Sequence, residues 1–298
     1  MVTKKQLYSF LDKSKETIES VFDDGVVHIW GLKSLRSFVK NAETINSIFG
    51  LTPLPVDNVI DYLLENSYLQ QVKFLTPRAE KLYLWRNPSE YEIMPILRPN
   101  GYYSHLSAMY FHGLLSASPH SVYFNCEQPV RPRAGNLEQS RIDNAFRKKQ
   151  RITTSRTKYN DIEYWLLNGK NTGNYGVATI KVNDSQIQVT NIERTLIDIT
   201  VRPAYAGGVK SVMEGYRLAK PKASTFEMSK TLRALDYIYP YYQSIGFYME
   251  AAGNYSAEDM QEFLNFGTFD YDFYLDYAMK DPEYSQRWKV YYPKDIFS

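Results

Sequence analysis

Residues 190–208, TNIERTLIDITVRPAYAGG, hold the densest cluster of local structural signals in this 298-residue chain. Thr190 and Asn191 are residue types that cap the free backbone N–H groups of a helix start, and Glu193 follows Thr190 at the spacing of a capping box. Leucine, isoleucine and valine then recur at helical intervals. We therefore predict a helix that begins after Thr190 and packs an apolar face against a core.

The same segment predicts where this helix ends. Arg202 precedes Pro203, and the residue before a proline is pushed away from the helical conformation. The glycines Gly207 and Gly208 then permit a sharp turn into a second helix over residues 209–220. Two helices joined by this hinge are the predicted centre of the protein.

The charged residues of the first helix favour an ion pair over a metal site. Arg194 and Asp198 lie four residues apart, so they share one helical face. A metal-dependent nuclease would instead need Glu193 and Asp198 to converge on one cation. Those two point about 140° apart, because the helix has 3.6 residues per turn. We therefore expect no enzyme, and the nuclease remains a lesser alternative.

The composition favours a two-domain protein without disulfides, metals or other cofactors. The length exceeds that of most single domains, and 44% hydrophobic residues can bury a large core. Cys126 is the single cysteine, and we expect it to be a small buried apolar residue. The N-terminus lacks a signal-peptide pattern and no apolar run is long enough to span a bilayer, so we expect a cytoplasmic protein without membrane contact.

The charge is distributed unevenly along the chain. Residues 1–99 carry a net charge of 0, residues 100–235 of +9 and residues 236–298 of −7. A basic middle and an acidic end predict either mutual docking or a polyanionic partner for the middle part.

Residues 1–95 are predicted to form a winged helix-turn-helix domain. Short helical segments precede a helix over residues 56–66, and strands at 69–75 and 81–86 form a hairpin. A helix-turn-helix followed by a hairpin is the order of winged-helix DNA readers. The residues that we expect to contact DNA are Asn58, Lys73, Arg78 and Lys81.

The helix over residues 56–66 has an unusual charge pattern for a DNA reader. Its predicted solvent side carries the carboxylates of Asp57, Asp61 and Glu65, which repel a phosphate backbone. DNA contact would then depend mainly on the basic hairpin. The alternative is a winged helix that serves protein contacts and no longer binds DNA.

Residues 96–235 are predicted to form an α+β domain with a small mixed or antiparallel sheet, after a turn-rich linker at 87–101. Ser104 is a candidate N-cap for a helix to residue 115. The expected strands lie at 121–126, 151–156, 162–167, 176–182 and 186–189. Further helices follow, and residues 236–298 are predicted to form a helical, acidic and aromatic extension that packs on this domain.

Two histidines and a basic stretch are the remaining polar features of the middle part. His105 and His112 are seven residues apart, whereas metal-binding pairs on a helix are usually four apart, so we expect packing at a helix–sheet junction. The alternative is a polar cluster with Arg194 and Asp198. Residues 131–158 form either a solvated surface or a phosphate-contacting patch. Its central basic residues are Arg147, Lys148, Lys149 and Arg151.

Two segments resemble the AbiEi-type antitoxins, the regulators of bacterial abortive-infection toxin–antitoxin pairs. The first is ERTLID followed by RPAYAGG within residues 193–208, and the second is YSHLSA followed by YFHGL within residues 103–114. Together, in this order and spacing, they are specific to that family. The resemblance covers most of residues 40–220, and the predicted winged helix matches the family's N-terminal domain.

The resemblance implies an antitoxin that represses its own operon through the winged helix and confers immunity through the C-terminal domain. The implied partners are operator DNA and a nucleotidyltransferase-like toxin, countered directly or without a stable complex. We expect a monomer in solution. The residues that match the family's motifs are Ser104, His105, Glu193, Arg194, Asp198, Arg202 and Gly208, and the resemblance favours a structural role for them over a catalytic one.

Overall fold

The computed structural model describes residues 3–25, 27–49, 55–74, 80–115, 117–130, 135–182 and 185–298. The chain divides into two compact units. The first unit comprises Met1–Pro99 and Ser155–Asn160, and the second comprises Asn100–Thr154 and Asp161–Ser298. Both helices and sheets are present, as the α+β prediction requires.

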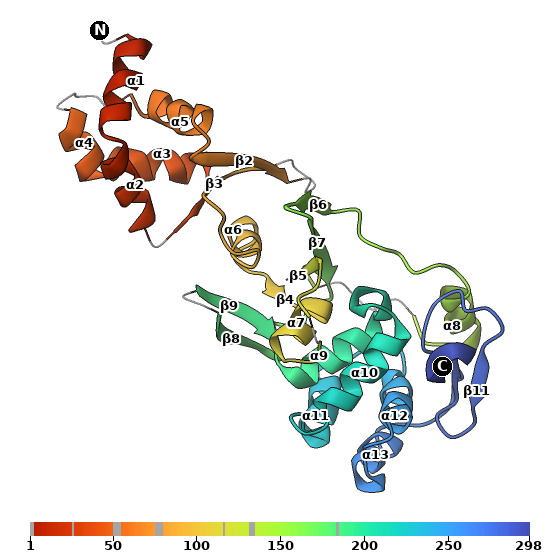
Figure 1. The fold of residues 1–298 in the computed structure, drawn as a ribbon. Helices are drawn as coiled ribbons and strands as arrows, with labels where there is room; N and C mark the ends of the chain where they lie inside the picture. Colours follow the sequence, from red (N-terminus) through yellow and green to blue (C-terminus); the bar gives the residue numbers. More distant parts are fainter. Residues whose placement is uncertain are drawn as a thin grey trace. The chain divides into compact units, whose positions relative to one another are not determined.

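The first unit combines helices with a three-stranded antiparallel sheet (Figure 1). The sheet order is β1-β3-β2, so the first strand pairs with the last. The elements are α1 (Lys4–Lys13), α2 (Lys15–Asp23), β1 (Ile29–Gly31), α3 (Leu32–Asn41), α4 (Glu43–Phe49), α5 (Val56–Glu65), β2 (Leu69–Phe74), β3 (Glu80–Trp85), α6 (Ile93–Leu97) and β6 (Arg156–Tyr159).

Aromatic side chains hold the core of the first unit together. Phe22 of α2 stacks on Trp85 of β3 with ring centroids 4.4 Å apart, and Trp85 Nε1 donates a hydrogen bond to Asp23 at 2.7 Å. The β2–β3 register puts Leu69 and Tyr83 on the same face of the sheet as Trp85, and all three are buried. This face of the sheet packs on the helices, and Leu82 and Leu84 on the other face of β3 are buried as well.

The segment predicted to be a linker contains a buried helix. Ile93, Met94 and Leu97 of α6 are all buried. The three prolines suggested an open linker, but Pro95 lies within this short helix. The apolar residues around it outweigh the turn signals, because burial overrides local propensity.

The second unit is built on a mixed sheet with the strand order β7-β5-β4-β9-β8. Pairs β5–β7 and β4–β9 are parallel, whereas β4–β5 and β8–β9 are antiparallel. The strands are β4 (Tyr102–Tyr103), β5 (Ser121–Glu127), β7 (Ile162–Gly169), β8 (Val177–Val182) and β9 (Ser185–Thr190). The strand predicted over residues 151–156 is wrong, because extended pairing begins only at Arg156.

Helix α9 (Ile192–Val201) is central to the second unit, with α7, α10, α11 and α12 all in contact with it (Figure 1). Every residue from Arg194 to Thr200 is buried, so α9 is covered on all sides and not on one apolar face. The remaining helices are α7 (His105–Phe111), α8 (Gln139–Phe146), η1 (Pro203–Ala206), α10 (Val209–Ala219), α11 (Thr225–Leu235), α12 (Tyr241–Ala252) and α13 (Ala257–Leu264).

The extension predicted to be helical is helical only in its first half, and three short strands that the prediction lacked follow. After α13 the chain forms β10 (Phe273–Tyr274), β11 (Glu283–Ser285), β12 (Val290–Tyr292) and η2 (Lys294–Phe297). The reason is packing against α12. A Cβ at Gly246 of α12 would lie 2.0 Å from the ring of Trp288, so the glycine admits that buried ring, which lies in the turn between β11 and β12.

Candidate functional site

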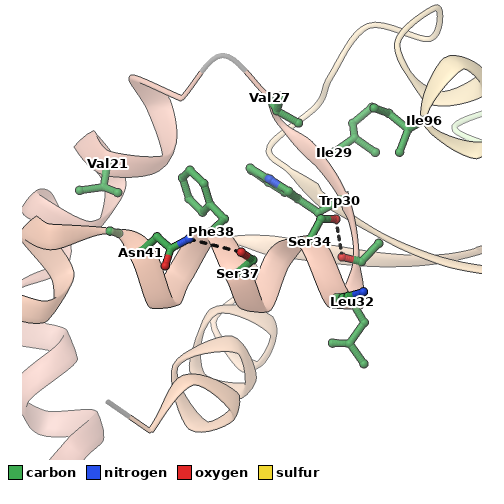
Figure 2. A pocket seen from close by; sticks show the side chains of 13 residues that line it. Val21, Val27, Ile29, Trp30, Leu32, Ser34, Ser37, Phe38, Asn41 and Ile96 are labelled. Atoms are coloured by element: carbon green, nitrogen blue, oxygen red, sulfur yellow. Dashed lines mark hydrogen bonds between the residues drawn. The ribbon is translucent and has the colours of Figure 1, made fainter. Parts of the chain in front are cut away.

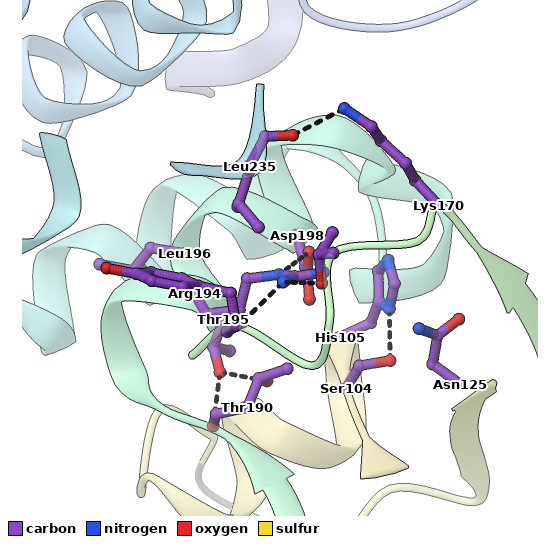
Figure 3. Close-up of polar contacts among 12 residues, drawn as sticks. Ser104, His105, Asn125, Lys170, Thr190, Arg194, Thr195, Leu196, Asp198 and Leu235 are labelled. Carbon is purple, nitrogen blue, oxygen red and sulfur yellow. Dashed lines mark hydrogen bonds and ion pairs between the residues drawn. The ribbon is translucent and has the colours of Figure 1, made fainter. Parts of the chain in front are cut away.

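The start of α9 differs in detail from the predicted capping box. Asn191 is the N-cap, and its side chain accepts a hydrogen bond from Arg194 N at 2.9 Å. Thr190 ends β9, so its hydroxyl bonds Thr195 Oγ1 at 2.8 Å instead (Figure 3). Glu193 Oε1 accepts from the backbone of Ser224, the N-cap of α11, at 3.0 Å. Glu193 therefore ties α9 to α11 and does not cap its own helix.

The predicted ion pair between Arg194 and Asp198 is formed in the interior (Figure 3). Arg194 Nε lies 2.8 Å from Asp198 Oδ1, and the side chains are 4% and 7% exposed. The guanidinium also donates to Tyr175 O at 2.8 Å and to Thr172 Oγ1 at 3.2 Å. These bonds satisfy the buried charge and connect α9 to the segment that precedes β8.

Burial and pairing act in opposite directions on the two charges. Burial raises the pKa of the Asp198 carboxyl above its usual value, and Arg194 limits that rise. Burial alone would lower the pKa of the Arg194 guanidinium, but the charge of Asp198 raises it above its usual value. Each group therefore depends on the other to stay ionised in a medium that disfavours charge.

His105 is the strained residue beside this pair. It occupies the first position of α7 with a φ of 52°, a left-handed conformation that non-glycine residues rarely adopt. Its Nδ1 lies 2.8 Å from Ser104 Oγ (Figure 3), so the Ser104 side chain bonds the imidazole and makes no cap bond to the helix backbone. Burial, with help from Arg202 and Arg194, lowers the pKa of His105 to about 3.

His112 has a separate role at the other end of α7. The helix ends at Phe111 rather than at residue 115, and His112 is its C-cap. Its Nε2 lies 2.6 Å from Thr190 O, at the end of β9. This is the helix–sheet junction predicted for both histidines, and in the structure it applies to His112.

A cavity of about 450 Å³ lies beside the Arg194–Asp198 pair. Its polar lining brings together five residues singled out from the sequence: His105, Arg151, Arg194, Asp198 and Arg202. The other predicted residues are not among its lining. Gly208 precedes α10 with a φ of 93°, and Arg147, Lys148 and Lys149 are exposed at the end of α8.

Several lining residues were missed by sequence reasoning. Asn125 is 5% exposed in the middle of β5, and its Nδ2 donates to Tyr102 OH at 2.6 Å. A Cβ at Gly169 would lie 2.5 Å from that Asn125 nitrogen, so the close strand pairing requires a glycine there. Lys170 follows directly, and Tyr205 and Tyr237 complete the aromatic lining. A polar residue inside the apolar strand VYFNC was the signal that could have identified Asn125.

In the first unit, Lys73 and Lys81 lie directly opposite each other on β2 and β3, and both are exposed. Like charges that face each other across two strands destabilise a hairpin. The two lysines therefore lower the stability of this hairpin, and a structural role does not explain them. Asn58 is half-buried on α5. Arg78 lies outside the described residues.

The acidic side of α5 is partly neutralised within the first unit. Arg36 Nε of α3 lies 2.7 Å from Asp57 Oδ1, and Lys4 Nζ of α1 lies 2.9 Å from Glu65 Oε1. Asp61 is exposed as predicted. Two of the three carboxylates on this helix are therefore held by cations of neighbouring helices.

The first unit also carries an open apolar pocket of about 980 Å³ (Figure 2). Trp30 and Phe38 line it, with centroids 5.1 Å apart, and exposed Leu32 and Ile96 extend its wall. Its lining residues from Gly31 to Ala42 belong to α3 and its two ends.

The described residues offer no built metal site and no membrane-spanning helix. Within these ranges no cluster of three or more histidine, cysteine, aspartate or glutamate side chains has the geometry to hold a metal ion. Glu193 and Asp198 are engaged by different partners, Ser224 and Arg194. No helix in the described part of the chain combines the length and apolar character that a bilayer crossing requires.

The chain matches no protein-family model and no curated protein sequence. Among solved structures, it is similar to the crystal structure of the RV2827C protein from Mycobacterium tuberculosis. The TM-score is 0.60 at 11% sequence identity, and the match covers 95% of this chain and 91% of that chain. At this identity the likeness concerns the fold alone, and it extends over both units.

Proposed function

We propose that this protein is an AbiEi-type antitoxin that represses its own operon through a winged helix in the first unit. The observation that carries the proposal is the order and pairing of elements there. Helices α3 to α5 are followed by the β2–β3 hairpin, and β1 before them pairs with β3. Winged-helix DNA readers share this order, with the hairpin as the wing.

The charge on the hairpin supports DNA contact. Lys73 and Lys81 are exposed on the same face of the sheet as Tyr83 and Trp85, which pack toward the helices. Two lysines on that face can contact phosphates on the side where a recognition helix enters a groove. The internal pairs of Asp57 and Glu65 reduce the repulsion that α5 would otherwise exert on DNA.

In this proposal the second unit provides immunity against a nucleotidyltransferase-like toxin. The antitoxin acts as a monomer, binds no metal and catalyses no reaction. The residues that match the family's motifs are mostly structural in character. Arg194 and Asp198 form a buried pair, Glu193 holds the start of α11, and Gly208 provides the turn into α10. The exposed residues Arg147, Lys148 and Lys149 remain the candidate contact for the toxin or its RNA substrate.

The first experiment measures binding of the full chain to its own upstream DNA by fluorescence anisotropy. A scrambled duplex of the same length and composition is the control. We expect tighter binding to the upstream duplex, because base contacts add to the non-specific phosphate term. Equal, weak binding to both duplexes would contradict the operator-binding part of the proposal.

A second experiment tests immunity in cells that express the toxin from the neighbouring gene. Replacing Arg147, Lys148 and Lys149 together by alanine should reduce protection if this surface contacts the toxin or RNA. The matched control replaces Lys210, Arg217 and Lys230, three exposed cations of the same unit that already pair with carboxylates. Full protection by the first variant, at equal protein level, would show that the patch is only a solvated surface.

The apolar pocket of Figure 2 favours a second candidate function, a winged helix that binds a protein instead of DNA. An exposed apolar surface with aromatic residues such as Trp30 is typical of protein contact sites. If the wild type does not bind its upstream DNA selectively, this alternative is favoured. If, in addition, the Trp30→Ala variant represses the operon as well as the wild type does, neither candidate is supported.

A further inference from the structure

The cavity beside α9 carries more positive charge than its own residues neutralise. Arg151, Lys170, Arg194 and Arg202 line it, and Asp198 is the single carboxylate among its described lining residues. Four cations against one carboxylate leave three net positive charges. His105 adds no charge near neutral pH, because burial lowers its pKa to about 3.

Two of the four cations have no ionic partner within the described residues. Arg151 and Arg202 are both exposed; Arg202 Nη1 donates to the Arg151 carbonyl at 3.3 Å, and its guanidinium lies 5.9 Å from the centre of the Tyr205 ring. By contrast, Arg194 is bound by Asp198. Lys170 Nζ donates to the Leu235 carbonyl oxygen at 2.7 Å (Figure 3), and it also donates to the Asp236 carbonyl oxygen. The guanidiniums of Arg151 and Arg202 are therefore available to an incoming anion.

The rest of the lining has the character of a small-molecule site. Its volume of about 450 Å³ falls in the range of such sites. Tyr205 and Tyr237 provide aromatic surface, and Asn125 provides a buried amide. His105 keeps its left-handed backbone here, with its ring edge-on to Tyr205 at 5.5 Å. Backbone strain in a residue that faces a cavity is common at ligand sites.

We propose that this cavity binds a small phosphomonoester. Arg151 and Arg202 donate to the phosphate oxygens, and the rings of Tyr205 and Tyr237 pack against the organic part. A dianionic phosphate suits the excess positive charge better than a single carboxylate does, and the guanidinium fork matches its oxygens in pairs. The proposal concerns the second unit and does not rest on the proposed function of the first.

The test is isothermal titration calorimetry of the full chain with adenosine 5′-monophosphate and with ribose 5-phosphate. Adenosine and ribose are the unphosphorylated controls. We expect at least one phosphorylated probe to bind and its unphosphorylated partner not to bind. Binding of adenosine as tight as that of its monophosphate, or no binding of either phosphorylated probe at millimolar concentration, would overturn the proposal.

Variants locate the binding site. Arg202→Ala and Arg151→Ala should each weaken binding about tenfold or more, the effect of losing a charge-assisted hydrogen bond. Arg217→Ala removes the same charge from an exposed position of α10, where Arg217 pairs with Glu214, and should leave the affinity unchanged. Circular dichroism checks that each variant is folded. Equal loss of affinity in all three variants would place the phosphate outside this cavity and overturn the assignment.

Discussion

Carboxylates of the two units illustrate how location decides what a charged side chain does. In the first unit, Asp57 of α5 is exposed and pairs with Arg36 across the surface. In the second unit, Asp198 of α9 is buried and pairs with Arg194, which is equally buried. An exposed pair contributes little to stability but changes the local surface charge. A buried pair is costly to desolvate, and removing one partner leaves an uncompensated charge in the interior.

The largest expected effect comes from breaking the buried pair. Asp198→Ala should lower the free energy of unfolding of the second unit by about 3–5 kcal/mol, because Arg194 stays buried without its counter-charge. Hydrogen–deuterium exchange of the α9 amides reports this unit separately from the first. The matched control is Glu214→Ala, which breaks an exposed pair of the same unit. Protection of α9 that is equal in the two variants would contradict the role given to burial.

Removing both charges should cost less than removing one. In Arg194→Met with Asp198→Leu, no unpaired charge remains, so α9 should be better protected from exchange than in Asp198→Ala. The variant also loses the bonds from Arg194 to Tyr175 and Thr172. A double variant less stable than Asp198→Ala would show that those hydrogen bonds, and not the ion pair, hold the segment before β8.

His105 predicts an acid dependence that is specific to the second unit. Its pKa is about 3 in the folded protein, against about 6.5 in an unfolded chain. The unfolded state therefore binds the extra proton first, and stability is lost as the pH falls from 6.5 toward 3, by up to about 1.4 kcal/mol per pH unit. His105→Asn, which tolerates the left-handed backbone, should flatten this slope. An unchanged slope of stability against pH would show that His105 does not control it.

These residues also mark what the sequence could and could not predict. The helix at α9, its end at Val201 and the Arg194–Asp198 pair follow from spacing of three to four residues and a proline, which are local signals. Of the two predicted capping residues, Asn191 is the N-cap, because Thr190 is paired in β9 and strand pairing is not a local signal.

The cavity was only partly accessible to sequence reasoning. His105, Arg194, Asp198 and Arg202 were named from motifs, but Asn125 and Lys170 reach the site through the pairing of β5 with β7, which no spacing in the sequence encodes. The C-terminal sheet escaped prediction for a similar reason. Its strands are two or three residues long, and packing against α12 rather than periodicity determines them.

The smallest effect is expected from the exposed pair of the first unit. Asp57→Asn should change the unfolding free energy by about 1 kcal/mol or less, since both partners are largely in water. Its consequence should be electrostatic: removing a carboxylate from α5 should strengthen DNA binding at low salt and do so less at high salt. Urea unfolding and anisotropy titrations measure the two effects. A large loss of stability would mean that this pair is structural, as the buried one is.

The most direct test of the account is the salt dependence of DNA affinity after the wing lysines are removed. Lys73→Ala with Lys81→Ala is compared with Lys5→Ala with Lys13→Ala, which removes two exposed lysines of α1. We expect weaker binding and a slope of log affinity against log salt that is shallower by about 2 for the wing variant only, because each lost phosphate contact removes about one counterion. An unchanged affinity and slope in the wing variant would contradict it.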